Sequence, residues 1–356
     1  WLAIPGEQFR LAETLGLGRR ALWRALELPM LMRIVPGAFA VILVICLSSF
    51  AVALTLGGGP RATTIELAIF QSMRFDFDLA RAAALGILQL VLALSAGLIA
   101  LRATRLSVAT KGLDRDAPRL KSHSAWSIGG DAVWIVLAAG FLLTPLVMVT
   151  WNGLGAIATL GASVWTSAAH SLGVALGSTA LCLLWALPLT TRWGEWLGLS
   201  GIALSPLVLG IGLFLIVRPY ANPFDLALYV TAVVNAFVSL PFALRILRPE
   251  ADAIRADFGR MRAALGLSAW CWVRWVLLPR LKRPLGFAAG LTAALSMGDL
   301  GVIALFADPD RATLPLKVYQ LMGAYRMEDA AGAALLLLMI SLGLFWLFDR
   351  GGRVGA

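Results

Sequence analysis

Few residues of this 356-residue chain could carry out chemistry. It has three cysteines, Cys46, Cys182 and Cys271, and two histidines, His123 and His170, all far apart in the sequence. They offer no Cys-x-x-Cys pair and no cluster of His, Cys and carboxylate residues with the spacing of metal ligands. We therefore expect no catalytic residues, no metal site and no cofactor.

One acidic residue has an unusual position. Asp299 lies about fourteen residues into an apolar segment, where an ionised side chain costs roughly 2.5–3.5 kcal/mol even on a lenient scale. A contact across helices, with Asn235 or with a backbone amide, would account for it, and so would a place on a substrate path. The residues alone leave both interpretations open.

A glycine-rich stretch runs through Gly57, Gly58 and Gly59 to Pro60. A phosphate-binding loop would need a Lys-Ser or Lys-Thr pair after the glycines, and none follows. The stretch therefore predicts a turn, and this chain is not expected to bind ATP.

The composition identifies the elements that must position these residues. Hydrophobic residues make up 60% of the chain and charged residues 14%, against about 45–50% and 25% in soluble domains. A bilayer is crossed by helices of about 20 apolar residues, because unpaired backbone groups are costly in lipid. We predict an all-α polytopic membrane protein with eight transmembrane helices, at residues 37–57, 82–101, 131–151, 170–190, 198–217, 226–247, 285–306 and 330–348.

The basic residues predict how the chain is oriented. The net charge is +10, and the Lys and Arg residues gather in residues 1–36, 102–130 and 245–284, which alternate with segments poor in positive charge. The positive-inside rule places these three segments in the cytoplasm, so the charge needs no nucleic-acid partner. We expect a multi-pass protein of the cell inner membrane with a cytoplasmic C-terminus.

The sequence contains an internal repeat at an offset of about 250 residues. Leu15-Gly16-Leu17 recurs as Leu265-Gly266-Leu267, and Arg61-Ala62-Thr63 recurs as Arg311-Ala312-Thr313. Repeats of this kind are typical of transporters. An even number of spans in each unit would make the two units parallel, with the substrate path between them.

The repeat predicts the division of the chain. Residues 1–101 would be the C-terminal part of a first permease unit, 102–130 a cytoplasmic linker, 131–349 a complete second unit with six spans, and 350–356 a cytoplasmic tail. The first unit would lack four spans. The chain starts at Trp1 with no Met and no charged leader, and we expect it to be a fragment.

A glycine and a proline recur with one spacing in both copies, at Gly16 and Pro29 and at Gly266 and Pro279. The glycine is expected to end one helix, the residues between to form a short helix, and the proline to begin the next span. The pattern resembles the cytoplasmic loop by which permeases of bacterial ATP-binding-cassette (ABC) importers dock on their ATPase. Where that family has Glu six residues before the glycine, this sequence has Arg10 and Arg260.

That resemblance implies a coupling role for eight residues, which are Gly16, Leu17, Gly18, Pro29, Gly266, Leu267, Ser268 and Pro279. Trp270, Trp272 and Trp275 follow the second glycine. These tryptophans could pack on the ATPase or anchor the segment at the membrane interface, where tryptophan is enriched.

Longer segments carry a closer resemblance, which covers nearly the whole chain. These segments are 54–60, 61–71, 74–78, 298–302 and 319–326, and they are similar to the fused two-unit permeases of bacterial thiamine ABC importers. The resemblance implies transport of thiamine or its phosphates by alternating access. It also implies two partners, a separate ABC ATPase subunit acting as a homodimer and a periplasmic binding protein. Asp299 would then lie on the substrate path.

Three other functions agree less well with the sequence. A ferric-iron ABC importer shares the two-unit plan, but a metal route favours several inward carboxylate, Tyr or His ligands. A proton-coupled secondary transporter would carry paired charges within the bundle and would need no repeated docking helix. An integral-membrane enzyme would need a nucleophile and base or a metal site. The sequence favours the importer.

Overall fold

The structure is a computed structural model that describes residues 11–12, 14–16, 18–57, 63–105, 125–190, 194, 204–306 and 311–353. Every regular element among these residues is a helix, and no strand occurs among them. The predicted all-α fold is confirmed.

The chain divides into two compact units. The first comprises Trp1–Cys46 and Val91–Leu146, and the second comprises Leu47–Leu90 and Val147–Ala356. The division into permease units that the repeat predicts, with bounds at residues 101, 131 and 349, stays a prediction.

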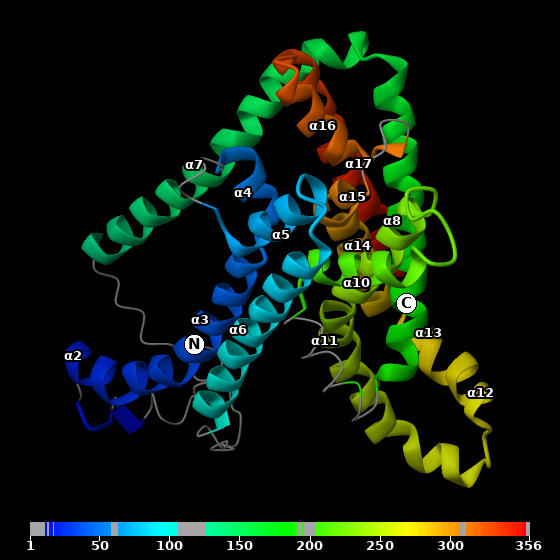
Figure 1. Ribbon diagram of the computed structural model, residues 1–356. Coiled ribbons are helices and arrows are strands. Elements are labelled where there is room, and N and C mark those ends of the chain that lie inside the picture. Colours follow the sequence, from blue (N-terminus) through cyan, green and yellow to red (C-terminus); the bar gives the residue numbers. More distant parts are fainter. Residues whose placement is uncertain are drawn as a thin grey trace. The chain divides into compact units, whose positions relative to one another are not determined.

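The helices follow one another in the order shown in Figure 1. In the N-terminal part of the chain they are α2 (Arg19–Leu22), the π-helix η1 (Trp23–Glu27), α3 (Leu28–Leu47), α4 (Phe50–Leu56), α5 (Ile65–Arg74), α6 (Leu79–Arg105) and α7 (Ala125–Ala156). After α7 come η2 (Ile157–Thr159), α8 (Ala162–Leu189), α10 (Pro206–Val217), α11 (Ala227–Ala264), α12 (Ala269–Trp272), the π-helix η3 (Val273–Leu277), α13 (Leu278–Arg280), α14 (Lys282–Met297), α15 (Gly301–Leu305), α16 (Leu314–Gly323) and α17 (Met327–Arg353).

Six segments of the described chain are long and apolar enough to cross a membrane. They are Leu79–Ala96, Gly129–Thr159, Ala162–Leu189, Ala227–Ala264, Lys282–Leu305 and Met327–Arg353. The window at 37–57 falls on α3 and α4, which Ser48 and Ser49 separate, and the window at 198–217 begins outside the described residues and continues as the 12-residue α10. A multi-pass membrane protein is thus supported, while the count of eight spans stays a prediction.

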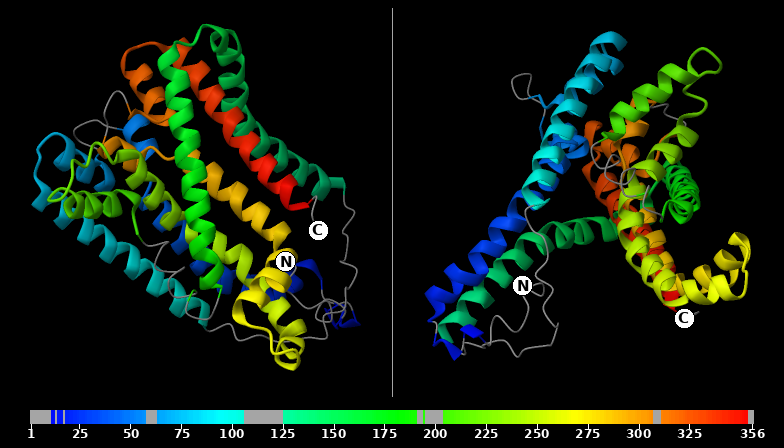
Figure 2. Two further views of the ribbon diagram at one scale, coloured as in Figure 1. Left: turned by 90° about the vertical axis from the view of Figure 1, so that its right-hand side faces the viewer. Right: turned by 90° about the horizontal axis from the view of Figure 1, so that it is seen from below.

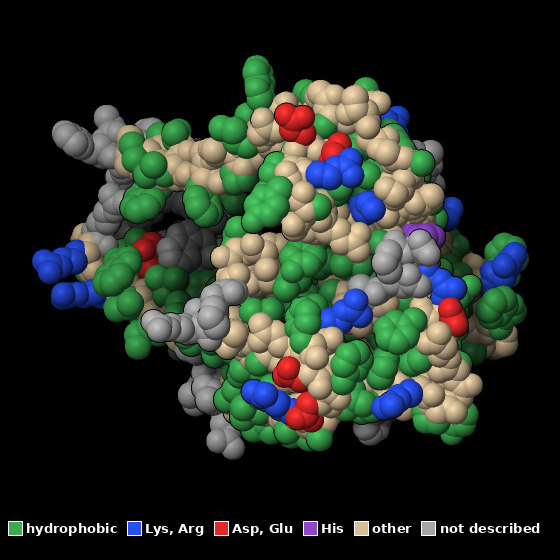
Figure 3. Space-filling model, turned by 45° about the horizontal axis from the view of Figure 1, so that its top comes forward, with side chains coloured by type: hydrophobic (Ala, Val, Ile, Leu, Met, Phe, Trp, Pro, Cys, Tyr) green, Lys and Arg blue, Asp and Glu red, His purple; other side chains and the backbone are tan. Residues whose placement is uncertain are grey.

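Apolar side chains lie on the outside of these helices. Trp134, Phe141 and Trp151 of α7 are all exposed, and Figure 3 shows a face on which hydrophobic side chains cover wide areas between isolated charges. Such a surface would be unfavourable in water over this extent but suits contact with lipid.

Helices α8, α11, α14 and α17 pack against one another in the second unit. Helices α14 and α17 run side by side, as Figures 1 and 2 show, and glycines line their contact. A Cβ atom added at Gly286 would lie 2.5 Å from the carbonyl oxygen of Phe348, and one at Gly352 would lie 2.7 Å from that of Lys282. The two backbones therefore touch directly, which only a residue without a side chain permits.

The same order of local elements occurs at two places in the chain. Positive φ angles at Gly16 and Gly266 and the π-helices that begin at Trp23 and Val273 are each displaced by 250 residues, from 16 to 266 and from 23 to 273. In each place a longer helix then ends, at Leu47 or Met297, and a short helix follows after two or three non-helical residues. The two segments differ after the proline, because α3 continues unbroken to Leu47 whereas the second segment leaves the helix at Leu281, between α13 and α14.

Candidate functional site

Gly266 ends helix α11, as the sequence predicts. Its φ is +60°, and its N–H donates to the carbonyl of Ala263 at 3.4 Å, while the N–H of Leu267 donates to the carbonyl of Arg262 at 3.1 Å. This pair of bonds closes a helix end in which the glycine adopts the left-handed conformation that other residues adopt only at a cost.

Ser268 starts the next helix. Its hydroxyl accepts a hydrogen bond from the backbone N–H of Cys271 at 3.3 Å and so caps the N-terminus of α12. Pro279 does not begin the following span, contrary to our expectation, because it is the second residue of the short helix α13. The chain leaves the helix at Leu281, and α14 begins at Lys282.

One tryptophan of this segment faces inward and two face outward. Trp272 is only 4% exposed and packs with Val276 and with Ile254 of α11. Trp270 and Trp275 are 69% and 72% exposed. Both roles weighed for Trp272, ATPase contact and membrane anchoring, are therefore wrong, because its ring belongs to the core between α11 and the short helices.

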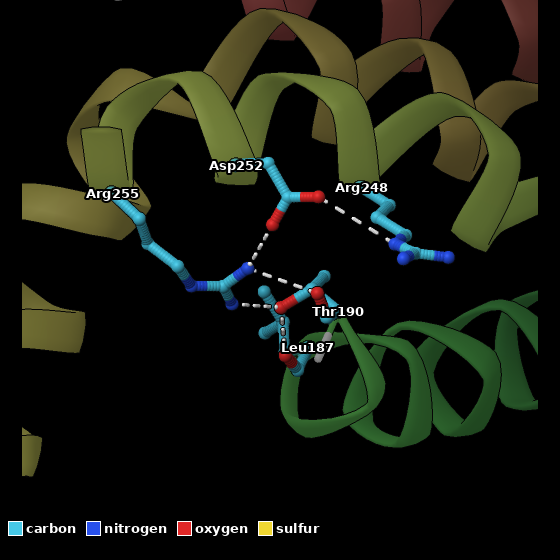
Figure 4. A network of polar contacts seen from close by, with 5 residues as sticks. All are labelled: Leu187, Thr190, Arg248, Asp252 and Arg255. Atoms are coloured by element: carbon cyan, nitrogen blue, oxygen red, sulfur yellow. Dashed lines mark hydrogen bonds and ion pairs between the residues drawn. The ribbon is translucent and has the colours of Figure 1, made fainter. Parts of the chain in front are cut away.

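An arginine in the C-terminal half of α11 binds the end of α8, as Figure 4 shows. Arg255 donates to the carbonyl of Thr190 at 2.9 Å and to its hydroxyl at 2.6 Å, and it pairs with Asp252 at 2.8 Å. Asp252 also pairs with Arg248 at 3.5 Å. The guanidinium thus satisfies a carbonyl at the C-terminus of α8, where the helix dipole favours positive charge.

The corresponding segment near the N-terminus shares several of these features. Gly16 has a φ of +63°, and the carbonyl of Gly18 accepts from the N–H groups of Ala21 and Leu22 at 2.9 and 3.0 Å. Pro29 is the second residue of the 20-residue helix α3, and that it begins a span stays a prediction. Leu17 lies outside the described residues.

Asp299 lies in a break between two helices and not within a continuous span. The predicted span at 285–306 agrees with the apolar segment Lys282–Leu305, but it is interrupted, because α14 ends at Met297 and α15 begins at Gly301. Asp299 Oδ1 accepts from the N–H of Gly301 at 3.1 Å, which confirms the backbone amide as a partner. The other expected partner, Asn235, also hydrogen-bonds to Asp299 through its side chain, and it donates to the hydroxyl of Ser296 at 3.0 Å.

A second carboxylate, which the sequence analysis did not single out, is more completely buried than Asp299. Glu66 of α5 is 0% exposed, and its Oε1 accepts from Gln89 Nε2 at 2.6 Å and from the hydroxyl of Ser205 at 2.5 Å. The pKa of the Glu66 carboxyl lies above its ordinary value, chiefly because burial disfavours the charged form. The hydrogen bonds from Ser205 and Gln89 lower this pKa, and the negative charge of Asp299 raises it.

The helical period of residues 65–74 could have revealed Glu66. It lies three, four and seven residues before Ile69, Phe70 and Met73, all of which are buried. Residues with this spacing share one helix face. A carboxylate on an otherwise apolar face is the available signal, and the charge pattern used for the topology does not contain it.

Glu66 and Asp299 line one pocket of about 180 Å³ in the second unit. Ser48, Ser49 and Gly298, from the two helix breaks, line it too, and none of the described residues that line it is Lys, Arg or His. A second pocket, of about 250 Å³, shares Asp299 and is also lined by Asn235, Ser239 and Ser296. Together the two pockets offer carboxylates, hydroxyls and an amide, and this set of groups favours a cationic ligand that also makes hydrogen bonds.

No group of three or more His, Cys, Asp or Glu side chains within the described part of the chain could hold a metal ion.

No family model matches this chain. Comparison with individual curated proteins does place it in a family. It is 37% identical to the thiamine transport system permease protein ThiP of Brucella abortus over 364 residues, which cover 98% of this chain and 67% of the relative. The corresponding proteins of Salmonella typhimurium and Escherichia coli are 38% and 37% identical over 98% of this chain and 68% of their own length. The chain thus spans about two thirds of the length of these relatives. It belongs to the family of thiamine transport system permease proteins.

Proposed function

We propose that this chain is part of the permease of an ABC importer that carries thiamine or its phosphates across the bacterial inner membrane. The observation that supports this most strongly is the 37–38% identity to thiamine permeases over 98% of the chain. The same relatives favour thiamine over ferric iron. A permease subunit of this kind is not itself an enzyme.

ATP hydrolysis belongs in this proposal to a separate ATPase subunit, and substrate delivery to a periplasmic binding protein. The ATPase would dock at the two segments Gly16–Pro29 and Gly266–Pro279. Two features support this role, namely the glycine-terminated helix end at both places and the two exposed tryptophans, Trp270 and Trp275. Because the segments share their local structure at a displacement of 250 residues, two identical ATPase subunits would fit them, and the permease units would be parallel.

The function is tested by uptake of radiolabelled thiamine into proteoliposomes that contain the full-length protein, its ATPase and its binding protein. We expect uptake that requires ATP and all three components. Uptake that persists without ATP and follows a proton gradient would instead show a secondary transporter. ATP-dependent uptake of ferric iron with no uptake of thiamine would also overturn the proposal.

The proposed orientation, with the docking segments and the C-terminus in the cytoplasm, predicts the reactivity of single cysteines. In a variant that lacks Cys46, Cys182 and Cys271, Ala221→Cys and Ala324→Cys are expected to react with a membrane-impermeant maleimide in cells with a permeabilised outer membrane. Ala256→Cys is not expected to react. All three positions are exposed, so accessibility from one side of the membrane decides the result.

Inverted vesicles provide the control for this experiment, because there Ala256→Cys should react and the other two should not. Labelling of Ala256→Cys from the periplasmic side would contradict the orientation.

A further inference from the structure

We propose that Glu66 and Asp299 together form the site that recognises the positive charge of the transported substrate, in the pocket between the two helix breaks. The proposal rests on the function proposed above and assigns a site to it. Glu66 is the new element, since it lines the same pocket as Asp299.

The two carboxylates are incompletely satisfied. Glu66 Oε2 and Asp299 Oδ2 are both buried, and neither has a hydrogen-bond partner among the described residues. A buried acceptor without a partner costs about 1–3 kcal/mol, and more when it is charged. Such groups are rare in native structures and call for an explanation. A cation bound between them would supply the missing interaction.

Helix ends of both polarities line the pocket. Helices α4, α10 and α15 begin at the lining residues Phe50, Pro206 and Gly301 and bring partial positive charge, so the negative charge of the pocket comes from its two carboxylates. Helices α3 and α14 end at Leu47 and Met297, directly before the lining residues Ser48 and Gly298. The C-terminal end of a helix carries a partial negative charge from its unpaired carbonyls. Helix breaks at the depth of the membrane are tolerated where they line a cavity, and transporters use such helix ends to bind cations.

Two neighbouring side chains fix the orientation of Glu66. Gln89 and Ser205 both donate to Oε1, and Gln89 also donates to the carbonyl of Leu47 at 3.3 Å. Oε1 is thereby occupied, whereas Oε2 remains without a protein donor. Gln89 and Ser205 are positioning residues, and Glu66 and Asp299 are the groups that would face the substrate.

The chemistry of thiamine matches this arrangement. Its thiazolium ring carries a fixed positive charge that would lose hydration in the protein interior and be stabilised by nearby anions. Its aminopyrimidine ring is neutral and makes hydrogen bonds. The adjoining pocket with Asn235, Ser239 and Ser296 offers neutral polar groups for that ring, and Asp299 lines both pockets.

The test compares a charged and a neutral substrate of the same shape. Proteoliposomes with the full-length protein, its ATPase and its binding protein take up either thiamine or an analogue in which a thiophene ring replaces the thiazolium. Each substrate is supplied at a concentration that saturates the binding protein. The uptake rate of thiamine divided by that of the neutral analogue, both per folded permease molecule, then measures the permease's preference for the charged substrate.

In Glu66→Gln this ratio is expected to fall at least about tenfold relative to wild type, which corresponds to about 1.4 kcal/mol of lost charge interaction. Glutamine keeps the Oε1 acceptor for Gln89 and Ser205 but carries no charge. The matched control is Glu328→Gln, because Glu328 is exposed at the start of α17 and its substitution removes one charge outside the pocket. The control should keep the wild-type ratio.

The outcomes separate this inference from the proposed function. If wild-type protein takes up thiamine and Glu66→Gln keeps both its rate and its preference for charge, the inference is wrong and the proposed function stands. If wild-type protein takes up no thiamine, the proposed function itself fails. Should Glu66→Gln not reach the membrane, the same ratio in Asp299→Asn decides, and an unchanged ratio there overturns the inference.

Discussion

Replacing Gly266 with arginine is expected to reduce ATP-driven thiamine uptake at least about tenfold while the protein still reaches the membrane. An L-residue in the left-handed conformation costs roughly 1–2 kcal/mol, and about 1.4 kcal/mol changes a population tenfold. A Cβ atom at Gly266 would meet nothing within 4 Å, so the strain of its φ of +60° is the main effect. The helix end would shift and turn Trp270 and Trp275 away from their present direction.

Uptake and ATP hydrolysis measured together in the reconstituted importer check this prediction, because hydrolysis without uptake is the mark of lost coupling. Gly259→Arg is the matched control, since it adds the same charge to α11 where the backbone is helical and the space around the Cβ is open. Gly266→Asn should retain most of the uptake, because asparagine tolerates the left-handed conformation better than other residues. Normal uptake by a normally expressed Gly266→Arg protein would remove the docking role from this segment.

Asp299→Asn is expected to lower thiamine uptake per molecule at least about tenfold without lowering the amount of protein in the membrane. Asparagine keeps an Oδ1 acceptor for the N–H of Gly301, which Asp299 now binds at 3.1 Å, so the start of α15 is preserved. The charge alone is lost. Unit charges about 4 Å apart interact by about 4 kcal/mol at an effective dielectric constant of 20, and a third of that is already tenfold.

The measurement is initial uptake normalised to folded permease, with Asp257→Asn as a control at an exposed position of α11. A purely structural role of Asp299 would appear as a loss of folded protein with normal uptake per remaining molecule. Unchanged uptake in a normally folded Asp299→Asn protein would leave Asp299 as a helix cap and remove it from the substrate path.

The parts of the fold that depend on local chemistry could be predicted from the sequence. Apolar runs of about 20 residues must be helical in a membrane, and every regular element among the described residues is a helix. Gly266 and Ser268 are a typical helix stop and helix start, and the structure has both.

The polar pocket could be predicted only in part, because hydropathy is averaged over a whole span. Such an average does not register the three non-helical residues at Gly298–Leu300, so Asp299 was expected inside a continuous helix. Glu66 is missed for a related reason, because the topology of its segment was predicted from charge and not from the helical period of its residues. Glu66 and Asp299 line one pocket although they are 233 positions apart (66 and 299), and no local pattern contains such a tertiary arrangement.

The direct contact of α14 with α17 constrains how this permease can change conformation. At Gly286 and Gly352 the backbones lie where a Cβ would collide. Sliding α14 by one helical turn of about 5.4 Å one way would bring Lys282 to the place of Gly286. Sliding it the other way would bring Ala294 to the place of Gly290, where a Cβ would lie 2.9 Å from the carbonyl oxygen of Phe345. We expect α14 and α17 to move together as one rigid body. The hinge of this movement would then be the non-helical residues 298–300, which also place Asp299 in the pocket.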